Sequence, residues 1–95
     1  MKTFKDLEFK KHKFSKRIQA SLELKPNVFI SVVAGEGMYS TSKAGVRAKA
    51  SKPEDVSTFE VAIINEKLEP DQQQWDVSGW QSREDINKLM LKWSK

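Results

Sequence analysis

The sequence predicts a single α+β domain, in which an antiparallel β-sheet of four to five strands packs against one C-terminal α-helix. Several segments alternate apolar and polar residues with the period of two typical of β-strands, and only the C-terminal segment has helical spacing. The chain has 95 residues, enough for one modest core. Because no strand–helix–strand repeat occurs, we expect no parallel sheet.

The N-terminal half contains the clearest strand pattern. Leu7 and Phe9 flank a polar residue, which is consistent with a short first strand. In residues 17–24 every second residue is apolar, as in a strand with one buried face. A turn at 25–27 contains proline and asparagine, and residues 28–34 are apolar on both faces. We therefore expect 28–34 to be the central strand.

Two further strands are predicted in the second half. Residues 58–65 have an apolar face and are expected to pair with the central strand. Residues 74–78 form a shorter alternating segment that suits the edge of the sheet. Trp75 and Val77 are expected to share the face that packs on the core.

The C-terminal residues change to the period of an amphipathic helix. Ser82 is a candidate N-cap, and acidic residues follow it where the helix dipole favours them. The apolar stripe expected to pack on the sheet consists of Ile86, Leu89, Met90 and Trp93. Trp80 precedes this helix, and we favour a hydrophobic staple on the core over an exposed binding anchor.

A long polar segment separates the central strand from the strand at 58–65. Its sequence is GEGMYSTSKAGVRAKASKPED, and we expect a mobile basic loop at about 37–57. Gly35 and Gly37 are expected to form a bulge or turn at the strand end. A phosphate-binding glycine loop is disfavoured, because these glycines do not lead into a helix and lack the P-loop spacing.

Positive charge is concentrated in the N-terminal run and in this loop. The net charge is +4, and residues 1–17 contain seven basic and two acidic residues. The candidate partner-binding residues are Lys10, Lys11, Lys13, Lys16, Arg17, Tyr39, Lys43, Arg47, Lys49 and Lys52. Three interpretations of the loop cations stay open: a solvated surface, which is favoured, contact with a protein, and contact with nucleic acid.

Catalysis has little support in the sequence. There is no cysteine, and His12 is the single histidine, so no triad or thiolate zinc site is expected. We expect a non-enzyme without cofactor or metal. No apolar run approaches the roughly 20 residues that span a bilayer, so a cytoplasmic protein with no membrane contact is expected.

Four segments resemble a set of short, mostly uncharacterised proteins encoded by bacteriophages and prophages. They are FKDLEFKKH, NVFISVVAGEGMYS, FEVAII and DVSGWQSREDINKLM. The chain departs from that group in its long lysine-containing insertion after Tyr39. The resemblance implies an antiparallel sheet with a C-terminal helix, in a small protein that acts in the cytoplasm of a bacterial host cell.

The same resemblance implies a function by occlusion. Many such phage proteins cover a surface on a host protein or a defence nucleoprotein, and CRISPR inhibitors are one class of them. We therefore expect a non-catalytic binding protein with a role in host takeover or anti-defence. A nucleic-acid-binding accessory protein and a virion or assembly component stay open as alternatives, as does homo-oligomerisation.

Overall fold

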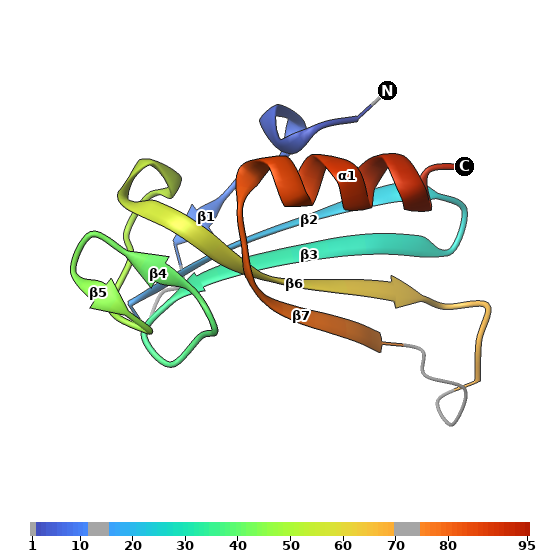
Figure 1. Cartoon of the computed structure of the whole chain (residues 1–95). Helices are drawn as coiled ribbons and strands as arrows, with labels where there is room; N and C mark the ends of the chain where they lie inside the picture. The colour runs from blue at the N-terminus through green and yellow to red at the C-terminus, as the bar shows by residue number, and fades with distance from the viewer. Residues whose placement is uncertain (1, 12–15, 70–74) are drawn as a thin grey trace.

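A computed structural model describes residues 2–11, 16–69 and 75–95 of the chain. It confirms the α+β class, with an antiparallel sheet and one C-terminal helix (Figure 1). The elements are the 3-10 helix η1 (Phe4–Asp6), β1 (Lys10–Lys11), β2 (Arg17–Lys25), β3 (Val28–Gly35), β4 (Thr41–Ser42), β5 (Gly45–Val46), the 3-10 helix η2 (Pro53–Asp55), β6 (Val56–Asn65), β7 (Trp75–Gln81) and α1 (Arg83–Trp93).

The sheet has seven strands in the described part of the chain, so the predicted four to five are too few. Their order is β1-β2-β3-β6-β4-β5, and β7 pairs with β6 beside this path. The three additional strands, β1, β4 and β5, have two residues each. Such strands are too short to show an alternating pattern, and their existence depends on the neighbours that the fold supplies.

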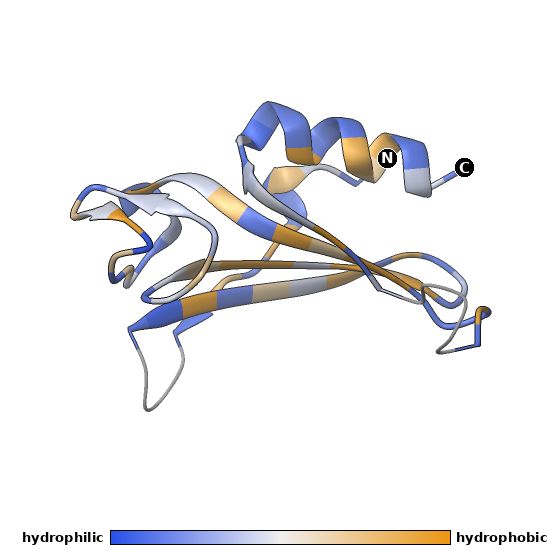
Figure 2. Cartoon of the chain, turned by 60° about the horizontal axis from the view of Figure 1, so that its bottom comes forward, coloured by the Kyte–Doolittle hydropathy of each residue, from blue (hydrophilic) through white to orange (hydrophobic). Residues whose placement is uncertain are grey.

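The core lies between the sheet and α1. The predicted central strand is confirmed: β3 pairs with β2 on one side and β6 on the other. Figure 2 shows α1 over one face of the sheet. Ile86 and Met90 of α1 are fully buried, and Trp93 packs against the core as expected. Leu7 is also buried, but residues 7–9 form no strand, since β1 begins at Lys10.

The apolar residues of β7 lie on the sheet face opposite α1, which corrects the prediction. Trp75 pairs with Ile64 and Val77 pairs with Ala62, and paired residues project to the same side. Trp75 and Val77 are 56% and 55% exposed. Alternation identifies residues that share a face, but it does not say which face is covered. Because β6 has apolar residues on both faces, either register of β7 on β6 would place the apolar residues of β7 beside apolar residues of β6.

Candidate binding sites: a lysine pocket and an aromatic cluster

The segment 36–55 leaves the sheet at the end of β3 and returns to it at β6. Gly35 has φ 133°, and a Cβ there would overlap Lys16 O and stand 2.6 Å from Arg17 Cα. Glu36 N and Ala50 N both donate to Lys16 O, each at 3.1 Å. Lys16, just before β2, therefore binds the backbone of the 36–55 segment at residues 36 and 50, and residues 35–38 form a turn.

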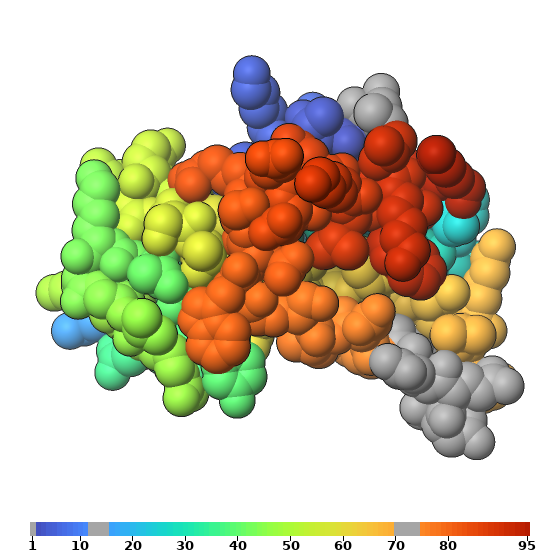
Figure 3. Space-filling model, viewed as in Figure 1, coloured from blue at the N-terminus to red at the C-terminus, as the bar shows by residue number. Residues whose placement is uncertain are grey.

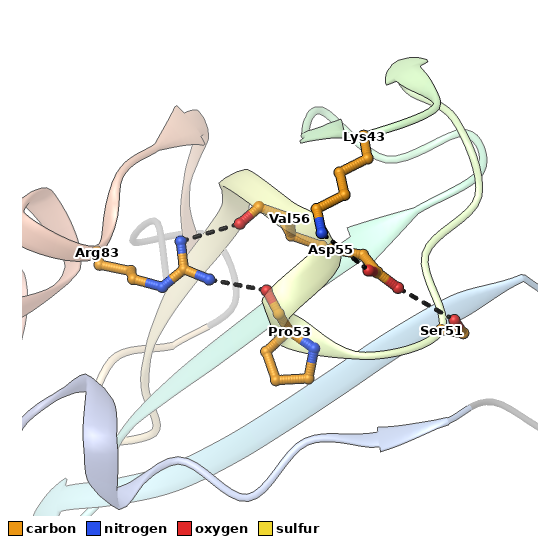
Figure 4. A network of polar contacts seen from close by, with 6 residues as sticks. All are labelled: Lys43, Ser51, Pro53, Asp55, Val56 and Arg83. Carbon is orange, nitrogen blue, oxygen red and sulfur yellow. Dashed lines mark hydrogen bonds and ion pairs between the residues drawn. The ribbon is translucent and has the colours of Figure 1, made fainter.

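The 36–55 segment contains regular structure. It was expected as a loop, but it includes the β4–β5 hairpin and η2. Figure 3 shows this segment, coloured green, at one end of the molecule. Lys43 N donates to Asp55 O at 2.8 Å, and Lys43 Nζ lies 3.8 Å from Asp55 Oδ1. Ser51 Oγ donates to Asp55 Oδ2 at 3.4 Å (Figure 4). The mobility of the segment stays a prediction.

Arg83, the first residue of α1, joins the helix to the returning end of this segment. Its guanidinium donates to Val56 O at 2.9 Å and to Pro53 O at 2.8 Å (Figure 4). It also lies over the rings of Phe4 and Phe59, at 5.1 and 5.3 Å from their centroids. The Arg83 side chain thus links the core with the returning end of the 36–55 segment.

A pocket of about 340 Å³ lies between the N-terminal basic run and the 36–55 segment. We call it the lysine pocket. It is lined by Lys11, Lys16, Lys43, Ala44, Lys49, Ala50, Ser51 and Asp55. Four positive side chains and one negative side chain give the lining a formal net charge of +3. Of the four lysines, Lys11 lies in β1 and Lys16 just before β2, whereas Lys43 lies in the β4–β5 turn and Lys49 after β5.

The lysine pocket has the chemistry of an anion site. Each ammonium group is a compact charge with three hydrogen-bond donors, which suits carboxylate and phosphate oxygens. The four lysines are exposed, so they keep their hydration until a ligand arrives. Holding like charges together is unfavourable, and an anionic ligand would relieve that repulsion. The pocket therefore favours ligands with several negative groups.

A second exposed feature consists of Tyr39, Trp80 and Arg47, which we call the aromatic cluster. The rings of Tyr39 and Trp80 lie 5.1 Å apart between centroids, tilted by 39°. Arg47 Cζ lies 5.0 Å from the centroid of the Tyr39 ring. Tyr39 and Trp80 are 45% and 49% exposed. Exposed aromatic rings beside an arginine are typical of protein interfaces.

A β-bulge in β7 places Trp80 in this cluster. The register with β6 shifts so that Gly79 and Trp80 together oppose Glu60. Trp80 has φ 51°, and its N–H donates to Tyr39 O at 2.8 Å. A Cβ on Gly79 would stand 2.8 Å from Tyr39 Cβ, so glycine permits the close approach. The staple prediction is wrong: the bulge turns the Trp80 ring away from the core and onto Tyr39.

Arg47 is fixed by the turn that follows β5. It has φ 58°, and its N–H donates to Ser40 O at 2.8 Å. Gly37 N donates to Arg47 O at 3.0 Å, and Arg47 Nη2 donates to Gly37 O at 3.1 Å. Arg17 reaches the same turn, where its Nε donates to Glu36 O at 2.8 Å. Two guanidinium groups are therefore held at residues 36–37.

The ten predicted partner-binding residues separate into groups. Those in the lysine pocket are Lys11, Lys16, Lys43 and Lys49. Tyr39 and Arg47 belong to the aromatic cluster, with Arg17 nearby. Lys10 and Lys52 do not line the pocket, and Lys13 lies outside the described residues.

Sequence reasoning missed five residues of these sites, of which Ala44 and Ala50 contribute small apolar side chains to the pocket lining. Ser51 and Asp55 line the lysine pocket, and Trp80 is exposed. The sequence gives little indication of their role, because polar loop residues and a tryptophan after glycine occur in many structural environments. The Gly79–Trp80 pair is the one hint of a bulge.

Other site types find little support in the residues that the structure describes. No group of three or more His, Cys, Asp or Glu side chains there could hold a metal ion. Within the same ranges, no helix has the length and apolar character needed to cross a bilayer. Comparison of the chain with protein-family models, curated proteins and solved structures finds no match.

Proposed function

We propose that the chain is a non-catalytic binding protein, encoded by a phage, which occludes an acidic surface of a host protein or nucleoprotein. A role in anti-defence, of the kind that CRISPR inhibitors exert, fits this mode of action. The sequence resemblance to phage proteins supports the origin. The lysine pocket supports the mode of binding, and it is the observation that carries the proposal.

The pocket suits an acidic protein surface. Four lysines around about 340 Å³ leave room for more than one carboxylate, and Asp55 offsets only part of their charge. Flexible, exposed ammonium groups contribute more to the rate of encounter and to rim contacts than to net affinity. Each ammonium group alone contributes little, but loss of all four removes steering, orientation and rim contacts together, so the pocket variant should no longer retain the partner.

Affinity recovery from a lysate of the bacterial host tests the proposal. The tagged chain is compared with a variant in which Lys11, Lys16, Lys43 and Lys49 are alanine. A control variant changes Lys5, Lys67, Lys88 and Lys95, outside the pocket, and so removes the same charge. We expect a partner protein that is recovered after nuclease treatment by the wild type and control, but not by the pocket variant. Equal recovery by the wild type and the pocket variant, or recovery of nucleic acid without a partner protein, contradicts the proposal.

A nucleic-acid-binding accessory protein is the second candidate, because ammonium groups suit phosphates as well as carboxylates. A labelled 20-nucleotide single strand and a 20-base-pair duplex are the probes. This alternative predicts binding that weakens steeply with salt, whereas a protein-directed inhibitor shows little affinity for either probe at about 150 mM salt.

A further inference from the structure

We propose that the aromatic cluster is a preorganised anchor for an acidic protein segment that presents large apolar side chains flanked by carboxylates. This inference rests on the proposed function, since it names the partner's chemistry at a second contact. It concerns Tyr39, Trp80 and Arg47, and the lysine pocket has no part in it.

The backbone is strained at this cluster. The described residues contain three non-glycine residues with positive φ, and two of them are Trp80 and Arg47. The third, Asn27, lies in the β2–β3 turn and belongs to a residue type that adopts this conformation readily. A bulky residue with positive φ is an outlier, and it persists only when the surrounding structure fixes it. At Trp80 the surrounding structure maintains a strained backbone whose side chain is exposed, and this points to a binding role.

The surroundings of Trp80 fix it in several ways. The bulge directs the residue out of β7, the N–H bond to Tyr39 O secures the backbone, and Gly79 allows Tyr39 to approach. A ring held in this way loses little conformational freedom when a partner binds, so more of the contact energy appears as affinity. Tryptophan, tyrosine and arginine are also the residues that dominate protein-interface hot spots.

The contacts within the cluster favour a protein partner over nucleic acid. Single strands are bound by stacking successive bases on open ring faces. Tyr39 already has Trp80 at 5.1 Å and Arg47 at 5.0 Å from its ring centroid, so the cluster offers one compact aromatic pair and not a row of separate stacking platforms. A compact aromatic projection of this kind suits contact with large apolar side chains of a protein segment. The guanidinium groups of Arg47, within the aromatic cluster, and of Arg17, beside it, favour carboxylates at the edge of the partner's contact surface.

Panning of a yeast-displayed library of random peptides, each about 12 residues long, tests the proposal and requires no identified partner. The immobilised wild type selects with no competitor present, and the affinity of each selected peptide for the wild type and for Trp80→Asn is then measured. Asparagine tolerates positive φ and keeps the N–H bond to Tyr39 O. We expect selected peptides to combine acidic and large apolar residues, and to bind Trp80→Asn at least about tenfold more weakly. Trp80→Gly, which tolerates the same φ, should behave alike.

Two results would overturn the proposal: selection that converges on no sequence, or peptides that bind both Trp80 variants as tightly as the wild type. A 20-nucleotide single strand that binds at about 150 mM salt and depends on Trp80 would assign the site to nucleic acid instead. Thermal unfolding midpoints near that of the wild type show that the variants are folded.

Gly79→Ala tests preorganisation, because it retains all three recognition side chains. The added methyl group would displace Tyr39, so selected peptides should lose affinity in this variant. Wild-type affinity in a folded Gly79→Ala contradicts preorganisation. The alanine variant of the lysine pocket should bind the peptides within about twofold of the wild type, since it leaves the residues of the aromatic cluster unchanged. If the lysate experiment fails while Trp80-dependent peptides are selected, the proposed function is refuted and the proposal for the aromatic cluster is not.

Discussion

Single glycines decide how closely the chain can approach itself at the 36–55 segment. Gly35 lies against the backbone of Lys16 and Arg17, whereas Gly45 at the β4–β5 turn has nothing near the position of a Cβ. Both have φ near 130°, so they share the backbone requirement but differ in space. The pair therefore separates the cost of strain from the cost of a clash.

We predict that Gly35→Ala destabilises the fold more than Gly45→Ala does. Strain alone costs about 1 to 3 kcal/mol at Gly45, and Gly35→Ala adds displacement of β2, for a total of roughly 3 kcal/mol or more. Urea unfolding of both variants measures the difference. Equal losses would mean that β2 moves freely away from the turn.

Trp80 is predicted to contribute little to stability. Trp80→Asn relieves about 1 kcal/mol of left-handed strain but loses a ring contact worth roughly 0.5 to 1.5 kcal/mol. The free energy of unfolding should therefore change by less than about 1 kcal/mol, as urea titration will show. Phe59→Ala provides the contrast, because this fully buried ring should cost about 3 to 5 kcal/mol. A large loss in Trp80→Asn would indicate a structural role.

The start of α1 is the element whose local chemistry is most fully determined by its sequence. Ser82 Oγ accepts from Asp85 N at 3.1 Å, and Asp85 Oδ2 accepts from Ser82 N at 3.0 Å. This confirms the predicted N-cap and completes a capping box. The Ser82 backbone N–H lowers the pKa of the Asp85 carboxyl below its ordinary value of 3.8, and the Ser82 side chain lowers it further.

Stability should therefore depend on pH through Asp85. A pKa that is lower in the folded than in the unfolded state adds stability above pH 3.8, and this is lost as pH falls through the folded pKa. We predict that Asp85→Asn unfolds at lower urea than the wild type at neutral pH, and that the difference narrows below pH 3.8. Glu84→Gln, whose carboxylate is largely exposed, is the control and should change little. A difference independent of pH would contradict this.

The long elements were predictable because each has enough residues to show its period. β2, β3, β6 and α1 satisfy this condition. The pairing of β2 with β3 follows from their short connection, whereas that of β3 with β6, across the long 36–55 segment, follows from apolar content. β1, β4 and β5 do not, since two residues carry no periodicity. The face of β7 depends on its register with β6, which the Gly79–Trp80 bulge alters in a way that the pattern of apolar residues does not reveal.

The candidate sites were predictable in composition but not in arrangement. The loop and N-terminal lysines are evident as charge runs, and the structure brings Lys11 and Lys16 to the same pocket as Lys43 and Lys49. The four lysines come together because Glu36 N and Ala50 N donate to Lys16 O. No local sequence pattern predicts these hydrogen bonds. Arg47 was grouped with the lysines by charge, yet its turn conformation places it on Tyr39.

At the scale of the whole molecule, both candidate sites use one end of a body measuring 37 × 29 × 21 Å. The 36–55 segment supplies Lys43 and Lys49 to the lysine pocket, and Tyr39 and Arg47 to the aromatic cluster. A standard interface covers about 800 Å² per partner, and the chain exposes 6110 Å². The partner would therefore cover only a small part of the surface.

Charge reversal inside and outside the lysine pocket tests the central claim most directly. Lys43→Glu with Lys49→Glu changes the net charge as much as Lys67→Glu with Lys88→Glu, but only the first pair lies in the pocket. Recovery of a partner protein from nuclease-treated host lysate is the measurement. The proposed function predicts that the first pair abolishes recovery and the second preserves it. Equal recovery by both pairs would show that the pocket does not hold the partner.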